Sequence, residues 1–308
     1  MSQKIKRRHN NPFMSTRGER TFYWINDGIM LFLIAITLYP MLYVVFCSFS
    51  DPSQYALKMG TLLTKPAGFS LQGYRTVFEM PTIWQGYRNT LLYLVLGVGI
   101  GMSLTIMGAY VLSHNDFMLK KGVMRLLVFT MYFSGGMIPT YLAVNSMGLT
   151  NTIWGFVLPG CVSVYNLIVL RTSFNSVPKS LYESAYIDGA GDMTVLFKIT
   201  LPLSVASLAT ITLFYAVGCW SAWYNALVYL QQRRDLYPLQ MVLRELLITD
   251  KTTEAFMDAT NEKAVNNYLL KEIVKYCTIV VATLPILVVY PFIQKYFVKG
   301  VMLGAIKE

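Results

Sequence analysis

The stretch "ESAYIDGAGDMTVLFKITLP", residues 183–202, is polar although apolar segments flank it on both sides. Pro178 precedes it, Gly189 and Gly191 interrupt it, and Pro202 closes it. Proline is favoured in the first turn of a helix, and glycine is favoured in turns. We therefore expect two short helices joined by a turn, placed between two long apolar helices.

The composition of the whole chain indicates a membrane protein. Of the 308 residues, 55% are hydrophobic and 14% are charged, whereas soluble domains carry about 25% charged residues. The net charge of +10 could suggest nucleic-acid binding. However, the basic residues lie mostly beside apolar segments, as the positive-inside rule predicts, so we expect a membrane and no nucleic acid.

A membrane-spanning helix needs about 20 apolar residues. Six segments meet this requirement: 25–48, 89–112, 123–144, 152–170, 203–230 and 276–294. The first is too long for a cleaved signal sequence, and no cleavage site follows it. The expected fold class is therefore an all-α membrane protein with six transmembrane helices.

The basic residues of the short loops and tails predict that both termini lie in the cytoplasm. The expected organisation is an N-terminal tail (1–24), a six-helix domain (25–294) with an inner loop (171–202) and a long outer loop (231–275), and a C-terminal tail (295–308). The outer loop is mixed in charge and is either a surface for an external partner or a solvated loop.

The sequence lacks the residues of common catalytic and energy-coupling sites. The Gly-Lys dipeptide of a phosphate-binding loop does not occur. The chain has two histidines, His9 and His114, outside the six apolar segments, and no segment has a charged residue at its centre. We expect no catalytic residue, metal or cofactor, so energy for transport would come from another subunit.

The four cysteines lie within or at the end of apolar runs and form no C-x-x-C pair. They are Cys47, Cys161, Cys219 and Cys277. We expect them to be reduced thiols that pack as small hydrophobic side chains.

The polar stretch has features of a docking element. Ser180 and Glu183 have the spacing of a capping box, which predicts a helix start there. Ala185 and Gly189 are small and would let a partner approach closely. The alternative is an ordinary amphipathic loop at the membrane surface.

The same residues carry a resemblance to a known family. Glu183, Ala185, Gly189, Ile199, Leu201 and Pro202 match the E-A-A-x-x-x-G-x9-I-x-L-P motif of binding-protein-dependent ABC importer permeases. Ser184 stands where the family has its first alanine of the motif, and Asp188 and Ala190 belong to a D-G-A extension. The C-terminal "YFVKGVMLGAIKE" resembles the tail of maltose-type carbohydrate permeases.

This resemblance implies a type I importer of the bacterial cell membrane. Two permease subunits, in most cases two different chains, would form the pore for an oligosaccharide. The polar stretch would be a coupling helix that docks on a cytosolic ATPase subunit, one of two, which bind the ATP and Mg²⁺. An external solute-binding protein would deliver the substrate.

The resemblance also assigns roles to residues. Glu183 would pair with a basic residue of the ATPase, and Ile199 and Leu201 would hold the loop against the spans. Gly304, Ala305 and Lys307 of the tail would reach toward the ATPase pair.

One group of residues suggests a sugar path. Trp220, Trp223 and Tyr224 are expected to share one face of the fifth span, and Ser221 and Asn225 add a hydroxyl and an amide. Aromatic rings stack on sugar C–H groups, while polar groups bind the hydroxyls. The alternative is an aromatic belt at the membrane interface.

Three other functions remain to be weighed. The docking motif is shared by ABC permeases for other solutes such as polyamines or phosphate, although the maltose-type tail opposes this. An intramembrane enzyme is opposed by the missing histidine and acid pairs. A membrane scaffold or sensor without transport is the third alternative.

Overall fold

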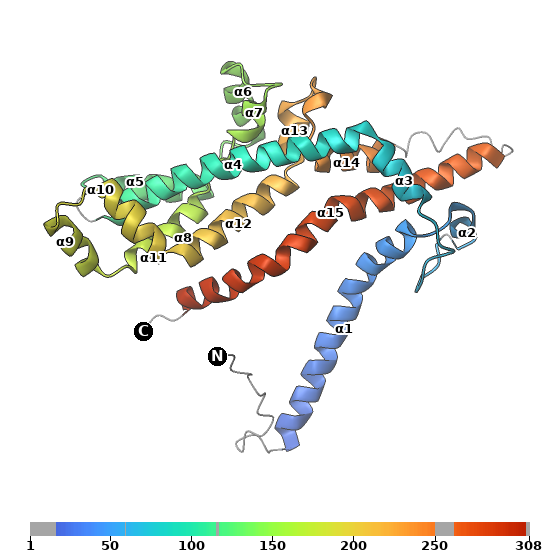
Figure 1. Cartoon of the computed structure of the whole chain (residues 1–308), viewed down its shortest axis with the longest axis horizontal. Helices are drawn as coiled ribbons and strands as arrows, with labels where there is room; N and C mark the ends of the chain where they lie inside the picture. Colours follow the sequence, from blue (N-terminus) through green and yellow to red (C-terminus); the bar gives the residue numbers. More distant parts are fainter. Residues whose placement is uncertain (1–16, 59, 115–116, 250–261, 306–308) are drawn as a thin grey trace.

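Every regular element in the part of the chain that the structure describes is a helix (Figure 1). The computed structural model describes residues 17–58, 60–114, 117–249 and 262–305, without the side chains of 17, 19–20, 249, 262–268 and 292–305. The helices are α1 (Arg17–Ser48), α2 (Pro52–Ala56), α3 (Gln72–Glu79), α4 (Pro81–Ser113), α5 (Lys120–Tyr132), α6 (Met137–Ser146), α7 (Ile153–Val157), α8 (Val164–Asn175), α9 (Lys179–Ile187), α10 (Asp192–Val195), η1 (Leu196–Thr200, a π-helical turn), α11 (Leu201–Leu203), α12 (Val205–Ser221), α13 (Tyr224–Tyr229), η2 (Arg234–Leu236, a 3₁₀ turn), α14 (Leu239–Thr249) and α15 (Glu262–Ala305). The predicted all-α class is confirmed.

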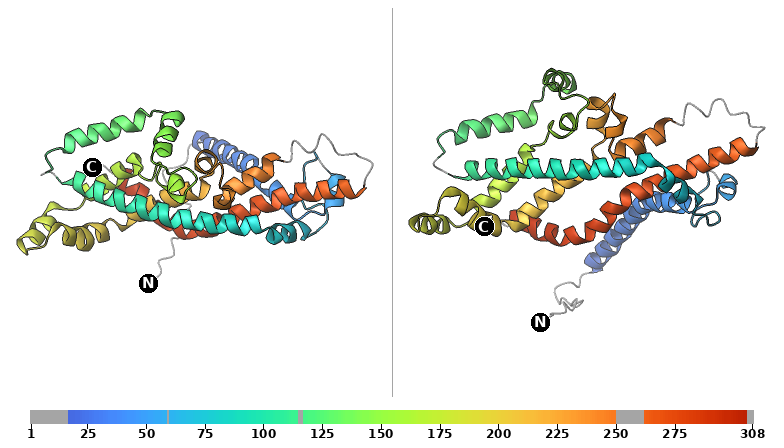
Figure 2. Two further views of the ribbon diagram at one scale, coloured as in Figure 1. Left: turned by 90° about the horizontal axis from the view of Figure 1, so that it is seen from above. Right: turned by 45° about the horizontal axis from the view of Figure 1, so that its top comes forward.

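Helices α4, α8, α12 and α15 form the body of the molecule, and α4 packs against both α8 and α12 (Figures 1 and 2). At one end, the buried Ile83 of α4 and Ile273 of α15 belong to one apolar cluster. At the other end, Leu170 of α8 and Ile211 of α12 pack with the last part of α4. A third cluster around Phe156 joins α7 and α13 to α4. The body therefore fixes both ends of α12 relative to α4.

Helix α1 leaves this body (Figure 1). The apolar window of its segment Thr21–Ser48 is 0% buried within the chain. It meets the body near its C-terminal end, where the Cys277 thiol of α15 donates a hydrogen bond to the Ser48 carbonyl at 3.2 Å. An apolar helix surface of this length needs lipid or another subunit to cover it.

Within the described residues, three helical segments are long and apolar enough to cross a membrane: Thr21–Ser48, Pro81–Ser113 and Leu269–Pro291. The number rises to five if the helices on either side of two sharp bends are each counted as one span. The three segments correspond to the predicted spans 25–48, 89–112 and 276–294. The count of six spans and their orientation stay predictions.

The predicted third and fourth spans are not continuous helices. Segment 123–144 is bent by 116° between α5 and α6, where the N-cap of α6, Gly136, has φ +84°, a conformation that a continuous helix does not allow. Segment 152–170 is α7 and part of α8, separated at Pro159 and Gly160. Gly160 has φ +78°, a left-handed conformation that ends a helix.

The predicted fifth span, 203–230, is also interrupted. The helical segment Asp192–Leu203 meets α12 at 86°. Helix α12 ends at Ser221, and α13 begins again at Tyr224. Such breaks at membrane depth occur where the backbone lines a cavity or is covered by protein.

Candidate functional site

The predicted coupling stretch forms a short helical hairpin, α9 and α10, at one end of the body. Figure 1 places this hairpin at the end where α4 finishes and α5 begins, and where α15 has its C-terminal end. Segments 113–125, 171–200 and the end of α15, all predicted to lie on the inner side, therefore lie at one end of the molecule.

The turn after α9 is fixed by its backbone. The Ala190 N–H donates to the Ala185 carbonyl at 2.9 Å, and the Gly189 N–H donates to the Tyr186 carbonyl at 3.0 Å. This pair of bonds is the Schellman motif, which needs a left-handed residue after the helix. Gly189 supplies that residue with φ +80°.

The start of α9 differs from the prediction. Pro178 is the N-cap, the helix begins at Lys179, and no side chain caps it. The capping box expected from Ser180 and Glu183 is therefore not formed. Ser180 lies inside the first turn, where its carbonyl accepts a hydrogen bond from the Ser184 hydroxyl at 2.5 Å.

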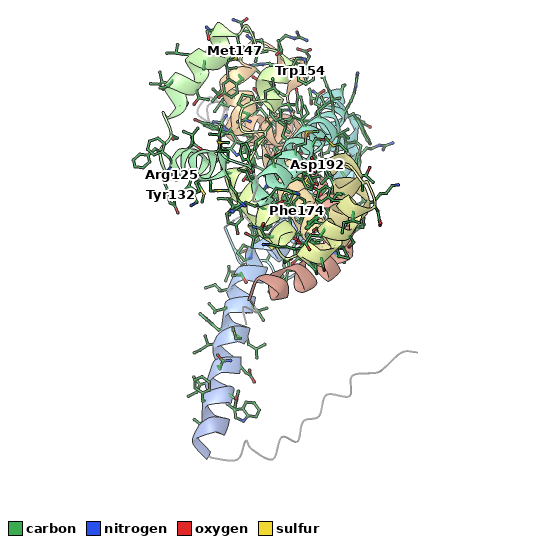
Figure 3. The ribbon with its side chains drawn as sticks, turned by 90° about the vertical axis from the view of Figure 1, so that its left-hand side faces the viewer. Arg125, Tyr132, Met147, Trp154, Phe174 and Asp192 are labelled. Carbon is green, nitrogen blue, oxygen red and sulfur yellow. The ribbon has the colours of Figure 1, made fainter. Side chains whose placement is uncertain are left out.

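Polar contacts fasten the hairpin to the end of α4. The Tyr186 hydroxyl donates to the Asp192 carboxylate at 2.7 Å, which joins α9 to α10. The Tyr110 hydroxyl of α4 donates to the Asp192 carbonyl at 3.1 Å. The His114 ring lies between the rings of Tyr110 and Tyr182, with centroid distances of 4.4 and 5.7 Å. Figure 3 views the molecule from this end, where Asp192 is labelled. The hairpin is thus held as one piece with α4.

The motif residues divide by exposure. The side chains of Glu183, Ser184 and Asp188 are exposed, as are Gly189 and Pro202, while Ala185, Ala190, Ile199 and Leu201 are half-buried. The exposed group lies mainly on α9 and the turn, and Leu201 packs against the cluster of α4, α8 and α12. The structure therefore places one part of the motif at the surface and another part against the body.

A π-helical turn and a sharp bend connect the hairpin to α12. Pro202 has no N–H to bond back to Lys198, which favours the wider turn over 196–200. The buried Thr200 hydroxyl donates to the Tyr182 hydroxyl at 3.3 Å, so η1 is tied to α9. Movement of α9 would therefore be transmitted directly to the start of α12.

The two broken helices face each other across a cavity of about 640 Å³. Pro159, Gly160 and Cys161 of the α7–α8 break line it, together with Cys219 and Ala222 at the end of α12. Five aromatic side chains also line it, namely those of Tyr93, Phe156, Tyr165, Phe214 and Tyr215. Discontinuous helices that surround a cavity are a common basis of binding sites in membrane transporters.

Side chains satisfy the backbone groups that the breaks expose. The Asn225 amide donates to the Phe156 carbonyl at 3.2 Å, and the Ser163 N–H donates to the Tyr215 hydroxyl at 3.0 Å. Each bond joins one broken helix to the other, so the cavity has a fixed, partly polar wall. Sequence reasoning missed this cavity, although Pro159-Gly160 inside an apolar run is the signal that could have found it.

The proposed path residues do not share one helical face, because α12 ends between them. Trp220 is 6% exposed, and its indole N–H donates to the Ala282 carbonyl at 3.3 Å. Trp223 and Tyr224 are 39% and 47% exposed, and the Tyr224 hydroxyl donates to the Met137 sulfur. Ser221 is exposed, and Asn225 lines the cavity. The expectation of a common face was wrong; the role in transport stays a prediction.

A cation lies over one ring of the exposed aromatic pair, that of Trp223. The guanidinium of Arg244 on α14 is 5.0 Å from the centre of the Trp223 ring. The Trp223 and Tyr224 rings meet edge to face at 5.8 Å. This group, Trp223, Tyr224 and Arg244, is called the aromatic–arginine group below. It combines flat apolar faces with a positive charge.

The loop after α13 is anchored on α4. The Asn89 amide donates to the carbonyls of Asp235 and Tyr237 at 2.8 and 3.0 Å. The Arg233 guanidinium donates two hydrogen bonds to the Asp235 carboxylate, which lowers the pKa of Asp235. These contacts hold the loop that leads into α14, and so they fix the position of Arg244.

Two further predictions fall partly outside the described residues. Gly304 and Ala305 lie in the last turn of α15, but their side-chain surroundings are not described, and Lys307 lies outside the described residues. Among the residues that the structure describes, no group of three or more His, Cys, Asp or Glu side chains could hold a metal ion.

The chain is similar over nearly its whole length to a curated relative. It is 39% identical to the polygalacturonan/rhamnogalacturonan transport system permease protein YtcP of Bacillus subtilis, over 94% of this chain and 99% of that protein. No family model matches the sequence.

Two solved structures share the fold. A chain of a bacterial ABC transporter involved in the import of the acidic polysaccharide alginate matches with a TM-score of 0.83 and 30% identity, over 92% of this chain and 99% of that one. A chain of the alginate ABC transporter in complex with a pentasaccharide-bound periplasmic protein matches with a TM-score of 0.51 and 16% identity, over 87% and 93%. The second likeness concerns the fold alone. The all-helical chain thus belongs to the permease subunits of binding-protein-dependent ABC importers for sugars, which are non-catalytic transport components.

Proposed function

We propose that this chain is half of the pore of a type I importer that carries oligosaccharides through the bacterial cell membrane. The other half is a second, different permease chain. Two cytosolic ATPase subunits bind ATP and Mg²⁺, and an external solute-binding protein delivers the substrate; this chain holds no cofactor. The observation that carries the proposal is that one helix, α12, joins the coupling hairpin at one end to the cavity at the other.

In this mechanism α9 is the docking surface for an ATPase subunit. The exposed carboxylate of Glu183 pairs with a basic residue of the ATPase, and Ser184, Asp188 and the Gly189 turn lie around it. The small residues Ala185 and Gly189 allow close approach, while half-buried Ile199 and Leu201 hold the hairpin on the body. Closure of the ATPase pair moves α9, and the bend at Ser204, two residues after Pro202, transmits that displacement to α12.

The translocation path includes the cavity between the broken helices and the aromatic–arginine group. Asn225 and Ser221 offer polar contacts beside the cavity, and Trp223 and Tyr224 offer exposed rings. Trp220 stabilises this region from the interior of the protein. Its ring packs edge to face on that of Tyr87, with 6.3 Å between the ring centres.

The substrate is an oligosaccharide with carboxylate groups. Polygalacturonan and alginate, the glycans of two similar proteins, are both polymers of uronic acids. Arg244 beside exposed aromatic rings is the combination that such a sugar requires, since the rings stack on the sugar face and the guanidinium binds the carboxylate. A non-sugar solute is less well supported, because a small ion such as phosphate has no flat apolar face that would stack on the exposed rings.

The proposed topology has six spans with both termini in the cytoplasm. The tail 1–24 and the tail 295–308 lie inside, and 25–294 is the membrane domain with the coupling loop 171–202 and the outer loop 231–275. The apolar surface of α1 would be covered by the second permease and by lipid. Gly304, Ala305 and Lys307 would extend toward the ATPase pair.

Reconstitution tests the proposal. The chain is purified with the other permease, the ATPase and the binding protein, and is placed in lipid vesicles. ATP hydrolysis should rise several-fold when the binding protein carries an oligouronate, and labelled sugar should enter the vesicles. A membrane scaffold or sensor would give neither signal.

The coupling step is tested separately. Glu183→Lys reverses the charge on α9, whereas Glu79→Lys makes the same change on α3, at the far end of the body. The first variant should lose association with the ATPase and the second should keep it. Equal association of both would contradict docking at α9.

A further inference from the structure

The geometry points to a binding site for the phosphate headgroup of an anionic phospholipid, where α4 ends and α5 begins. The site lies on the side that the proposed orientation makes cytoplasmic, and it goes beyond the transport function.

The first observation is an open cavity of about 900 Å³ between α5 and α8. Lys120, Lys121 and Arg125 of α5 line it, and Arg171 of α8 lies opposite them. The remaining lining residues are Phe117 and two methionines. Among the residues that the structure describes, four basic side chains and no acidic one therefore face a common volume.

A second cavity of about 590 Å³ adjoins the first and shares Lys120 and Arg171 with it. It also receives Lys179 and Glu183 from the coupling helix. Glu183 gives this second cavity a local anion, so we place the phosphate in the first cavity, with Arg171 at the boundary between the two.

Hydrogen bonds to the end of α4 hold two of these cations in place. The Arg171 Nε–H donates to the Leu112 carbonyl at 2.9 Å, and the Lys120 ammonium donates to the Ser113 and His114 carbonyls at 3.2 and 3.0 Å. The Nε bond fixes the plane of the guanidinium, which has four further N–H donors. A planar donor group held in this way suits a phosphate.

The carbonyls at the end of α4 stabilise Lys120 and Arg171, whereas the start of α5 is an unfavourable position for a cation such as Lys121 unless an anion is present. Lys120 and Lys121 lie in the first turn of α5, which has no acidic residue, and Arg125 follows in the next turn. The positive end of the helix dipole repels these charges, whereas an anion would be attracted both by the dipole and by the side chains. The positive-inside rule explains basic residues on this side of a membrane. It does not explain why α5 and α8 direct them into one cavity.

The surface beyond the cavity favours a lipid over a soluble phosphate. Leu126, Phe129 and Phe133 continue along α5 from Arg125 and are exposed. Figure 3 shows Arg125 and, further along the same helix, Tyr132. An acyl chain would cover this apolar face while its headgroup stays at the cations, as basic pockets on the cytoplasmic side of membrane proteins do with anionic lipids.

The test is a binding titration of the complete, delipidated transport complex, in which native mass spectrometry measures the bound lipid. The probes are phosphatidylglycerol, phosphatidylcholine and inorganic phosphate. Phosphatidylglycerol should bind the wild-type complex at least ten-fold more tightly than phosphatidylcholine. Lys121→Gln/Arg125→Gln should weaken phosphatidylglycerol binding about 25-fold, since each cation near a membrane contributes about five-fold. These two residues are exposed, so their exchange leaves the body of the protein intact.

Two control variants sharpen the result. Lys58→Gln/Lys65→Gln removes the same charge from the far end of the molecule and should leave binding unchanged. Lys121→Arg/Arg125→Lys keeps the charge and should bind normally. Equal binding of the two phospholipids, or less than a two-fold effect of the glutamine pair, would overturn the site. Equally tight binding of inorganic phosphate would overturn its assignment to a lipid.

Discussion

The Tyr186 hydroxyl on α9 donates a hydrogen bond of 2.7 Å to the Asp192 carboxylate on α10. Five residues separate the two, and the Schellman turn at Gly189 brings them together. The same Asp192 offers its carbonyl to Tyr110 of α4. This one acid therefore connects the two arms of the hairpin and fastens them to the body.

Tyr186→Phe should loosen the hairpin without unfolding the protein. A hydrogen bond to a charged group contributes about 1.5–3 kcal/mol when it is shielded, and less at an exposed site such as this one. We expect faster amide hydrogen exchange over 183–192 and fewer sugar molecules carried per ATP hydrolysed. Tyr132→Phe, an exposed tyrosine of α5, is the control and should change neither quantity.

Gly189→Ala should strain the turn, because an L-residue at φ +80° costs about 1–2 kcal/mol. Gly191→Ala is a matched control two residues away. Gly191 has φ −79°, which any residue adopts, and nothing lies within 4 Å of a Cβ built at either glycine. Association with the ATPase should fall in the first variant only. A similar loss in both would show that the partner needs the small size of the residues and not the turn.

Much of the fold could be predicted because it depends on local chemistry. The apolar lengths of 25–48, 89–112 and 276–294 each correspond to a helical segment, and the two glycines of 183–202 mark the interruption between α9 and α10. These features follow from hydropathy and from the backbone preferences of Gly and Pro.

The rest depends on contacts that a single sequence does not show. The interruption after Ser221 leaves backbone groups exposed, and Asn225 stabilises the region by bonding Phe156, which is far away in the sequence. Trp220 and Trp223 have the spacing of a helix face, but α12 ends at Ser221, between them, and Trp220 bonds to α15 while Trp223 is exposed. The capping box failed for a local reason, since Pro178 is already the N-cap of α9, two residues before Ser180.

Trp220 and Trp223 should respond differently to truncation. Trp220→Ala removes a buried ring that bonds to α15, and such changes cost about 3–5 kcal/mol. We expect less folded protein in the membrane, measured by thermal unfolding of the purified complex. Trp223→Ala removes a side chain that is 39% exposed. It should leave the unfolding temperature nearly unchanged while uptake slows. A Trp223→Ala variant with normal uptake would assign the ring to the membrane interface and not to the path.

Arg244 should govern the preference for charged over neutral oligosaccharides. Its guanidinium is 5.0 Å from the centre of the Trp223 ring, so a sugar stacked nearby would bring its carboxylate within reach. Removing a charge-assisted hydrogen bond costs about 1.5–3 kcal/mol, which corresponds to a roughly ten- to hundred-fold slower uptake of oligouronates. Arg244→Gln should show this loss while uptake of a reduced, neutral oligosaccharide of equal length stays the same, when both are delivered at saturating concentrations of binding protein.

Arg244→Lys keeps the charge but loses the planar donor group, so an intermediate rate is expected. Arg75→Gln, on the exposed face of α3, is the control for loss of positive charge. If Arg244→Gln slowed both sugars equally, its role would be to hold Trp223 in place and not to read the carboxylate.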